Sequence, residues 1–344
     1  MPRFYEVEYQ KNGFIDKLDV KEGVKGEVQK QVVQDLDAAF YPQKFIVPYM
    51  DVVHDRVNLE IARGCTGGCR FCQAGMIYRP VRERSHERIK ELAKNLVEKT
   101  GYEEISLTSL SSGDYTGIAG LATDLVDKYE TDKISVALPS MRVDSFSVDL
   151  AQELQKVRKT GLTFAPEAGT QRLRDVINKG IEEEDIISAA KDAFEAGWRK
   201  VKLYFMIGLP TETEADLQGI VDLANKLAQL GDKIRLDSDY KRRVKVNVSV
   251  STFVPKAHTP FQWSKFNTLT EIDKKLQFLK DNLRGKDLSL DWNQPTISLL
   301  EAVFARGDRR TADLLEEAWR LGARFDGWRE LFDYDLWNEA AAKS

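Results

Sequence analysis

Residues 57–75 read VNLEIARGCTGGCRFCQAG, and they join a strand pattern to the chain's only cysteines. The first five residues alternate between apolar and polar side chains, which is typical of a strand with one buried face. Cys65, Cys69 and Cys72 follow at once, and the glycines between them let the backbone turn tightly enough for three sulfurs to converge. The stretch therefore predicts a strand that carries a three-thiol loop at its carboxyl end.

The spacing Cys-x3-Cys-x2-Cys indicates a metal site. Three thiols in one loop cannot form a disulfide framework, and three thiolates suit zinc or an iron–sulfur cluster. A structural zinc ion normally takes four protein ligands, for which the chain offers only His54, His86 and His258 beside the cysteines. A 4Fe-4S cluster on three thiolates would leave one iron without a protein ligand. Both interpretations stay open on the spacing alone.

The rest of the pattern predicts a partial α/β barrel. Alternating segments recur six times, each followed by an amphipathic helical stretch, which indicates parallel strands joined by helices. The predicted strands cover 56–62, 104–109, 133–138, 162–165, 200–206 and 243–253. Their second face is polar, whereas strands covered on both sides, or lining a closed barrel, are apolar throughout. We therefore predict an open, TIM-like (βα)6 barrel whose concave face is wet enough to hold a ligand.

The cysteine motif, with Phe71 before the last cysteine, resembles that of the radical S-adenosylmethionine (SAM) enzymes, whose core fold is also a partial (βα)6 barrel. The resemblance implies that Cys65, Cys69 and Cys72 hold an oxygen-sensitive 4Fe-4S cluster and that SAM chelates the fourth iron. It also implies an electron donor of the flavodoxin or ferredoxin type. The reduced cluster then cleaves SAM to methionine and a 5'-deoxyadenosyl radical.

The resemblance continues in the loops after the strands, where α/β barrels carry their chemistry. Ser111–Asp114 is similar to a Gly-Gly-Glu motif, with Ser and Asp replacing Gly and Glu, and 205–210 is similar to an adenine platform that lacks its first glycine. A Ser-x-Arg segment and an acidic residue follow the third and fourth strands. The SAM-binding residues that this resemblance implies are Phe71, Ser112, Gly113, Asp114, Ser140, Arg142, Glu167, Lys179, Met206, Ile207 and Gly208. Catalytic residues toward the substrate are not identified.

The sequence predicts three parts: an N-terminal strap over 1–55, the barrel over 56–263 and a mostly helical C-terminal domain over 264–344. A helix is expected across Val28, Val32 and Leu36, and a capping box at Thr211 and Glu214 is expected to open another. The arrangement resembles uncharacterised radical SAM proteins that often carry a cobalamin-binding domain before the barrel. Residues 1–55 are too few for that domain, so the chain is either a trimmed form or a cobalamin-free version, and any cobalamin would come from another chain or domain.

Composition narrows the class of protein. The 51 basic and 55 acidic residues give a net charge of −4, which argues against a broad nucleic-acid surface. No run approaches the roughly 18 apolar residues of a membrane span, and the N-terminus is too polar for a signal peptide. We expect a cytoplasmic globular protein with no membrane partner.

Two alternatives to a radical SAM enzyme remain: a zinc-stabilised α/β protein without redox chemistry, and a cluster-bearing RNA-binding module. The RNA-binding alternative rests on local basic clusters and on four tryptophans, Trp292, Trp319, Trp328 and Trp337. Packing in the protein core is the ordinary interpretation of these tryptophans, and stacking on RNA bases is the more specific one. No cysteine remains for a second cluster, which disfavours methylthio transfer. The sequence does not identify the substrate, which could be RNA or a protein. It also does not determine whether SAM serves as radical source or methyl donor, or what the oligomeric state is.

Overall fold

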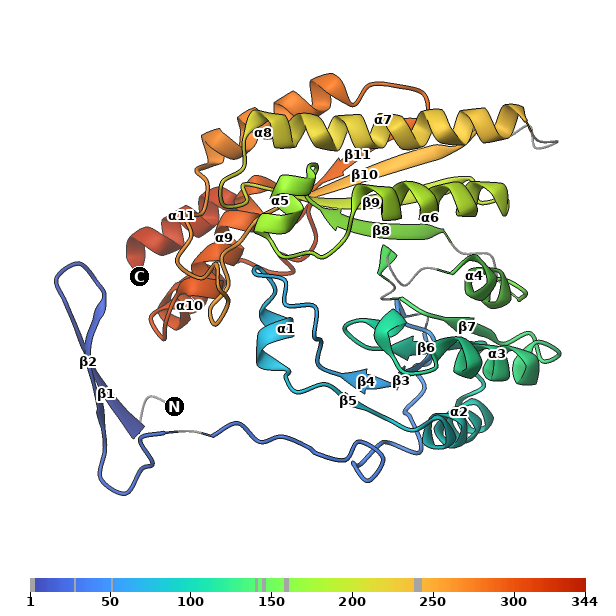
Figure 1. Cartoon of the computed structure of the whole chain (residues 1–344). Coiled ribbons are helices and arrows are strands. Elements are labelled where there is room, and N and C mark those ends of the chain that lie inside the picture. Colours follow the sequence, from blue (N-terminus) through green and yellow to red (C-terminus); the bar gives the residue numbers. More distant parts are fainter. Residues whose placement is uncertain are drawn as a thin grey trace. The chain divides into compact units, whose positions relative to one another are not determined.

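The computed structural model describes residues 4–27, 29–50, 52–139, 142–143, 147–157, 161–237 and 243–344. Strands and helices alternate along most of this length (Figure 1). The strands are β1 Tyr5–Tyr9, β2 Ile15–Val20, β3 Val57–Glu60, β4 Ala62–Arg63, β5 Arg82–Glu83, β6 Glu104–Thr108, β7 Ser135–Ala137, β8 Leu162–Glu167, β9 Lys200–Ile207, β10 Lys245–Thr252 and β11 Leu288–Trp292. The helices are α1 Gln73–Ile77, α2 His86–Thr100, α3 Ile118–Tyr129, α4 Val148–Leu154, α5 Gln171–Val176, α6 Glu183–Glu195, α7 Glu214–Leu236, α8 Leu269–Asn282, α9 Pro295–Arg306, α10 Thr311–Leu321 and α11 Tyr334–Lys343, with the 3-10 turn η2 Ser112–Asp114.

Parallel strands form the wall of the barrel in two sheets. One has the order β3-β6-β7 and the other β8-β9-β10-β11, so each strand pairs with its neighbour along the barrel. Among the described residues β7 and β8 belong to different sheets, which leaves a seam between them. A cavity of about 520 Å³ lies in the seam, lined in part by Leu138, Leu154, Phe164 and Trp198. The predicted α/β fold with parallel strands is confirmed.

Each sheet packs one face on helices and keeps the other face polar. In β9 the buried residues Val201, Leu203 and Phe205 alternate with the partly exposed Lys202 and Tyr204. Buried side chains of α6, α7 and α8 complete the core over the four-stranded sheet, and α2 and α3 do so over the other sheet (Figure 1). This alternation is what the sequence predicts for a barrel with a polar inner face.

One strand of the four-stranded parallel sheet is missing from the sequence prediction. Residues 264–344 are expected to be mostly helical, yet β11 pairs in parallel with β10, with Leu288 opposite Val246 and Trp292 opposite Val250. Helix α8 then covers the same sheet, where Ile272 is fully buried. The strand is only five residues long between two helices, so its alternation is weak beside the helical pattern around it.

Two predicted helix features are wrong. Helix α7 begins after Thr213, whose capping box is closed by Asp216 rather than by the predicted Thr211 and Glu214. Residues 29–34 form no helix; Leu36 is instead buried, and its carbonyl accepts a hydrogen bond from the Arg84 guanidinium. Val28 lies outside the described residues. Three apolar residues over roughly two turns give a helix too little to bury, and Leu36 is buried within the unit formed by residues 35–306.

The chain divides into two compact units, residues 35–306 and residues 1–34 with 307–344. In the second unit β1 and β2 form an antiparallel hairpin, and Arg310 lies 4.2 Å from the centre of the Tyr9 ring. Trp337 is buried there, but Trp319 and Trp328 are 60% and 62% exposed, so core packing is the wrong expectation for these two. The predicted boundaries after residues 55 and 263 stay predictions. Among the described helices, none is long and apolar enough to cross a membrane.

The closest backbone approach in the packing of α7 gives a test. A side chain on Gly219 would lie 2.7 Å from the Gly169 carbonyl oxygen, a backbone atom that cannot swing away. We expect Gly219→Ala to lower the free energy of unfolding by about 1–3 kcal/mol in urea denaturation. Gly120→Ala in α3 is the control, because nothing lies within 4 Å of its added carbon. Equal stability of the two variants would contradict the packing.

Candidate iron–sulfur and cofactor site

The cysteine loop, residues 64–72, runs from β4 into α1. Cys72 caps the start of α1, where its sulfur accepts a hydrogen bond from the Gly75 amide at 3.4 Å. The Cys65 sulfur accepts one from the Gly67 amide at 3.3 Å. A carbon added to Gly67 would stand 3.4 Å from the Cys65 sulfur and 3.9 Å from the Cys69 sulfur. Two sulfurs thus flank one point of the backbone, and amide donors directed at sulfur favour thiolates.

A distant piece of chain holds this loop in place. We call residues 175–180, the end of α5 and the turn after it, the bracing segment. The Asn178 side chain donates to the Gly68 carbonyl oxygen at 3.0 Å, and the Arg70 amide donates to the Ile177 carbonyl oxygen at 2.9 Å. The Arg70 guanidinium also donates to the Val176 carbonyl oxygen at 2.6 Å. The cysteine loop is therefore held by hydrogen bonds to the bracing segment, which comes after β8 in the chain.

Three predicted charged residues meet beside the loop. Lys179 Nζ lies 3.2 Å from Glu167 Oε1, and Arg142 donates to the Lys179 carbonyl oxygen at 3.1 Å. Burial raises the pKa of Glu167, with Lys179 opposing the shift. Burial also raises the pKa of Cys69, and the nearby Lys179 and Arg142 charges act to lower it. The cations thus favour both the carboxylate and the thiolate.

The predicted adenine platform divides between two environments. Phe71 and Met206 pack against one apolar cluster that contains Leu209 and Phe253, so the cysteine loop and the end of β9 meet there. Ile207 is fully buried in the core beneath the helices.

The predicted residues 112–114 follow β6, at the carboxyl end of the three-stranded sheet. Ser112 is fully buried and donates to the Leu107 carbonyl oxygen at 3.2 Å, while Asp114 is exposed in η2. The hydroxyl of Ser111 is buried and has no hydrogen-bond partner within the described ranges. A buried orphan hydroxyl is a polar group that a ligand can satisfy. Ser140 lies outside the described residues.

Sequence reasoning missed the residues that support these loops. Both carboxylate oxygens of Glu212 accept from the Gly208 amide at 3.0 Å, and Lys275 of α8 lies 2.5 Å from Glu212 Oε1. Gly208 has a φ of +84°, and a side chain there would meet Asn267 at 3.2 Å. The one feature of the sequence near Gly208 that could have indicated this support is the acidic residue Glu212, four positions later. Nothing near Asn178 in the sequence points to a contact 110 residues away.

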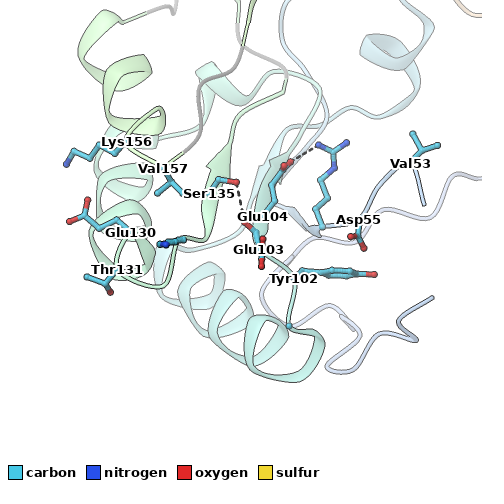
Figure 2. Close-up of a pocket in the computed structure, with 13 residues that line it drawn as sticks. Val53, Asp55, Tyr102, Glu103, Glu104, Glu130, Thr131, Ser135, Lys156 and Val157 are labelled. Carbon is cyan, nitrogen blue, oxygen red and sulfur yellow. Dashed lines mark hydrogen bonds and ion pairs between the residues drawn. The ribbon is translucent and has the colours of Figure 1, made fainter. Parts of the chain in front are cut away.

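A second large cavity lies at the other end of the strands. Figure 2 shows its charged lining at the N-terminal ends of β6 and β7, where Arg56 and Glu104 pair at 2.7 Å. Its volume is about 1290 Å³. The cysteine loop follows the opposite, carboxyl ends of the strands, so this cavity is not part of the same site.

The histidines of the zinc alternative have other surroundings. His86 stacks on Tyr115 at 5.5 Å, and His54 Nδ1 lies 2.8 Å from Arg56 Nη2. His258 is in the loop after β10, whose Ala257 carbonyl oxygen accepts from Gln73 at 3.1 Å. Across the described ranges, no three His, Cys, Asp or Glu side chains are grouped so as to hold a single metal ion.

These features define a class: an open α/β barrel with a three-cysteine loop, a buried lysine and a partly buried arginine at the carboxyl end of its parallel strands. The model of the radical SAM superfamily matches residues 59–224, from β3 into α7. Residues 59–224, just under half of the 344 residues, therefore carry a radical SAM domain, the domain of a superfamily of enzymes.

Known relatives agree with this assignment. An uncharacterised protein of Methanocaldococcus jannaschii is 32% identical over 302 residues, covering 85% of this chain and 63% of the relative. An uncharacterised methyltransferase of Pyrococcus horikoshii is 25% identical, covering 59% and 45%. The ribosomal protein uS12 methylthiotransferase of Pelotomaculum thermopropionicum is 25% identical, covering 54% and 43%. The chain spans less than two thirds of the length of each.

The support of Gly208 by Glu212 makes stability depend on pH. Burial raises the pKa of Glu212 more than Lys275 and the backbone amides lower it. A raised carboxyl pKa gives stability that is full below about pH 4.5 and is lost as the pH rises through the folded-state value. We therefore expect the free energy of unfolding of the wild type to fall, relative to that of Glu212→Gln, as the pH rises through the folded-state pKa of Glu212. Urea denaturation at several pH values measures this difference.

Glu271→Gln is the matched control on α8. A hydrogen bond from Lys265 and the cap at Thr268 lower the pKa of Glu271 to about 2. Its contribution is therefore present above pH 4.5 and lost as the pH falls toward 2, the reverse of Glu212. If the Glu212→Gln profile runs parallel to the wild type, Glu212 carries no shifted pKa.

Proposed function

We propose that this chain binds a 4Fe-4S cluster through Cys65, Cys69 and Cys72 and reductively cleaves SAM to act on a substrate still to be identified. The observation that carries the proposal is the position of Cys69 near the cations Lys179 and Arg142, in a loop whose other two thiols lie near it. When bound, the reduced cluster supplies the electron that converts SAM to methionine and a 5'-deoxyadenosyl radical. Thiolate ligation and hydrogen bonds to sulfur tune such a cluster.

The protein's own part is to bind and orient SAM. Lys179 and Arg142 offer positive charge to the SAM carboxylate, and Glu167 accepts hydrogen bonds from its ammonium or ribose groups. Glu167 is suited to this because Lys179 and burial hold it in one place. Ser111, Ser112, Gly113 and Asp114 are proposed for the amino group.

Apolar residues would enclose the adenine. Phe71 and Met206 are proposed for its faces, with Ile207 and Gly208 supplying backbone. Because this cluster joins the cysteine loop to β9, it would fix the ring relative to the thiols.

The relatives' names include methyl and methylthio transfer, which supports SAM as the cofactor and leaves the product open. Residues 1–344 hold no cysteines beyond Cys65, Cys69 and Cys72, so the second cluster that methylthio transfer needs would have to be held outside them. Methyl transfer with cobalamin from another chain or domain is the variant to compare with direct radical chemistry. Detecting 5'-deoxyadenosine or S-adenosylhomocysteine after turnover distinguishes them.

The exposed Trp319 and Trp328 are the one observation that favours an RNA-binding module. Against it, residues 307–344 hold six Lys and Arg side chains and nine Asp and Glu side chains, a net charge of 6 − 9 = −3. Nucleic-acid surfaces are basic. We therefore rank RNA binding below the radical SAM activity.

The cluster assignment predicts the metal content. After anaerobic reconstitution we expect iron and labile sulfide in equal amounts, and release of 5'-deoxyadenosine from SAM under dithionite. Cys72→Ala should lose both, because an unligated corner destabilises the cluster. Unchanged thermal unfolding of the metal-free variant would show that the fold survives. Bound zinc without sulfide would instead support the zinc-stabilised alternative.

The cofactor assignment predicts a separate loss of SAM binding. The double variant Lys179→Met/Glu167→Gln removes both charges together, so no lone buried charge remains. Loss of charge-assisted contacts worth about 1.5–3 kcal/mol should weaken SAM binding roughly 10- to 150-fold in equilibrium dialysis, with the cluster intact.

The control is the matched ion pair at the other end of the strands, changed as Arg56→Gln/Glu104→Gln (Figure 2). This control should bind SAM like the wild type. Equal weakening in both double variants would mean that the losses come from the fold and not from the site.

A further inference from the structure

An exposed turn follows the cysteines directly. Residues 77–82, here called the docking turn, leave α1 and enter β5. Ile77, Tyr78 and Val81 are 37%, 46% and 39% exposed, and Arg79 between them is also exposed. An apolar centre with an arginine beside it is the composition of protein–protein contact sites.

The docking turn is fastened to the cysteine loop from both sides. Cys72 caps α1, and Tyr78 ends that helix six residues later, about 9 Å along its axis. On the other side, a side chain on Gly64 would stand 2.7 Å from the carbonyl oxygens of Tyr78 and Pro80. The turn therefore lies against the residue before Cys65, so a partner seated on it is close to the thiols.

The charge of this region is one-sided. Between Glu60 and Glu83 the chain contains four arginines, Arg63, Arg70, Arg79 and Arg82, and no acidic residue. Arg63 and Arg82 stand directly opposite each other in the β4–β5 pair, an arrangement of like charges that destabilises a strand pair. Glu60 offsets part of this through its 2.7 Å contact with Arg63. The chain as a whole is acidic, so this concentration of arginine is local.

We propose that the docking turn, with Arg63, is the surface on which an acidic one-electron carrier protein binds to reduce the cluster. The proposal rests on the proposed function, because the carrier needs a cluster to reduce. The reduced carrier, a flavodoxin or ferredoxin, gives up one electron to the cluster and is itself oxidised. Charge complementarity selects an acidic partner, and the small apolar centre suits a short-lived complex.

The first measurement is binding without turnover. Oxidised flavodoxin is titrated calorimetrically onto the reconstituted protein in the absence of SAM. We expect Arg79→Glu to weaken binding about tenfold at 50 mM salt and less at 500 mM, because salt screens surface charges. Val81→Asp should weaken it at both. Arg284→Glu, an exposed arginine at the end of α8, should bind like the wild type.

The second measurement compares reductants. SAM cleavage driven by reduced flavodoxin should slow in Arg79→Glu and Val81→Asp, whereas cleavage driven by dithionite, which needs no docking surface, should equal that of the wild type. Equal dithionite rates also show that fold and cluster are intact.

The outcomes separate the two proposals. If the wild type binds neither flavodoxin nor ferredoxin, or if Arg79→Glu and Val81→Asp bind flavodoxin as tightly as it does, the docking proposal is overturned. If both reductants slow equally, the turn supports the cluster and docks nothing, which also overturns it. If dithionite releases no 5'-deoxyadenosine from the wild type, the proposed function fails, and the calorimetry still decides whether the turn binds an acidic carrier.

Discussion

The hydrogen bonds between the cysteine loop and the bracing segment are the contact on which the arrangement of the site depends. Asn178 and Arg70 tie residues that are more than 100 positions apart in the chain. The loop follows β4, which continues the chain from β3 of the three-stranded sheet, and the bracing segment comes after β8 of the four-stranded sheet. These bonds therefore cross between the sheets at the end where the thiols lie. At that end they connect the two parts of the barrel, as the hydrogen bonds between paired strands connect its wall elsewhere.

The same contact explains why the charged residues meet. The bracing segment ends in Lys179, so fixing its backbone against the loop also places that cation beside Glu167 and near Cys69. Glu167 itself has a φ of +67°, at a register shift in β8. A non-glycine residue in that region is uncommon, and it turns the carboxylate out of the alternation of the strand. The site thus draws its charges from an irregular strand end and a braced loop.

Sequence patterns were informative wherever a residue's partner is set by its own element. Alternation placed β3, β6, β9 and β10 because burial on one face repeats every second residue. The cysteine spacing and its resemblance to a known motif identified the family. The pattern failed for β11, which is short, and for the start of α7, where two Thr-x-x-acid frames overlap and only the buried Asp216 fits. It could not show Asn178 or Glu212, whose roles depend on contacts made across the fold.

The seam between β7 and β8 has a consequence for the size of what the barrel can accept. In a closed barrel, the number of strands and their stagger fix the diameter, and any widening breaks backbone hydrogen bonds. Here, among the described strands, no ladder joins the two sheets. The seam cavity is lined by side chains such as Leu138 and Trp198, which change rotamers without losing backbone pairing. The width of the barrel at this seam is therefore set by side-chain packing, whereas the hydrogen bonds between the cysteine loop and the bracing segment join the two sides at the carboxyl end of the strands.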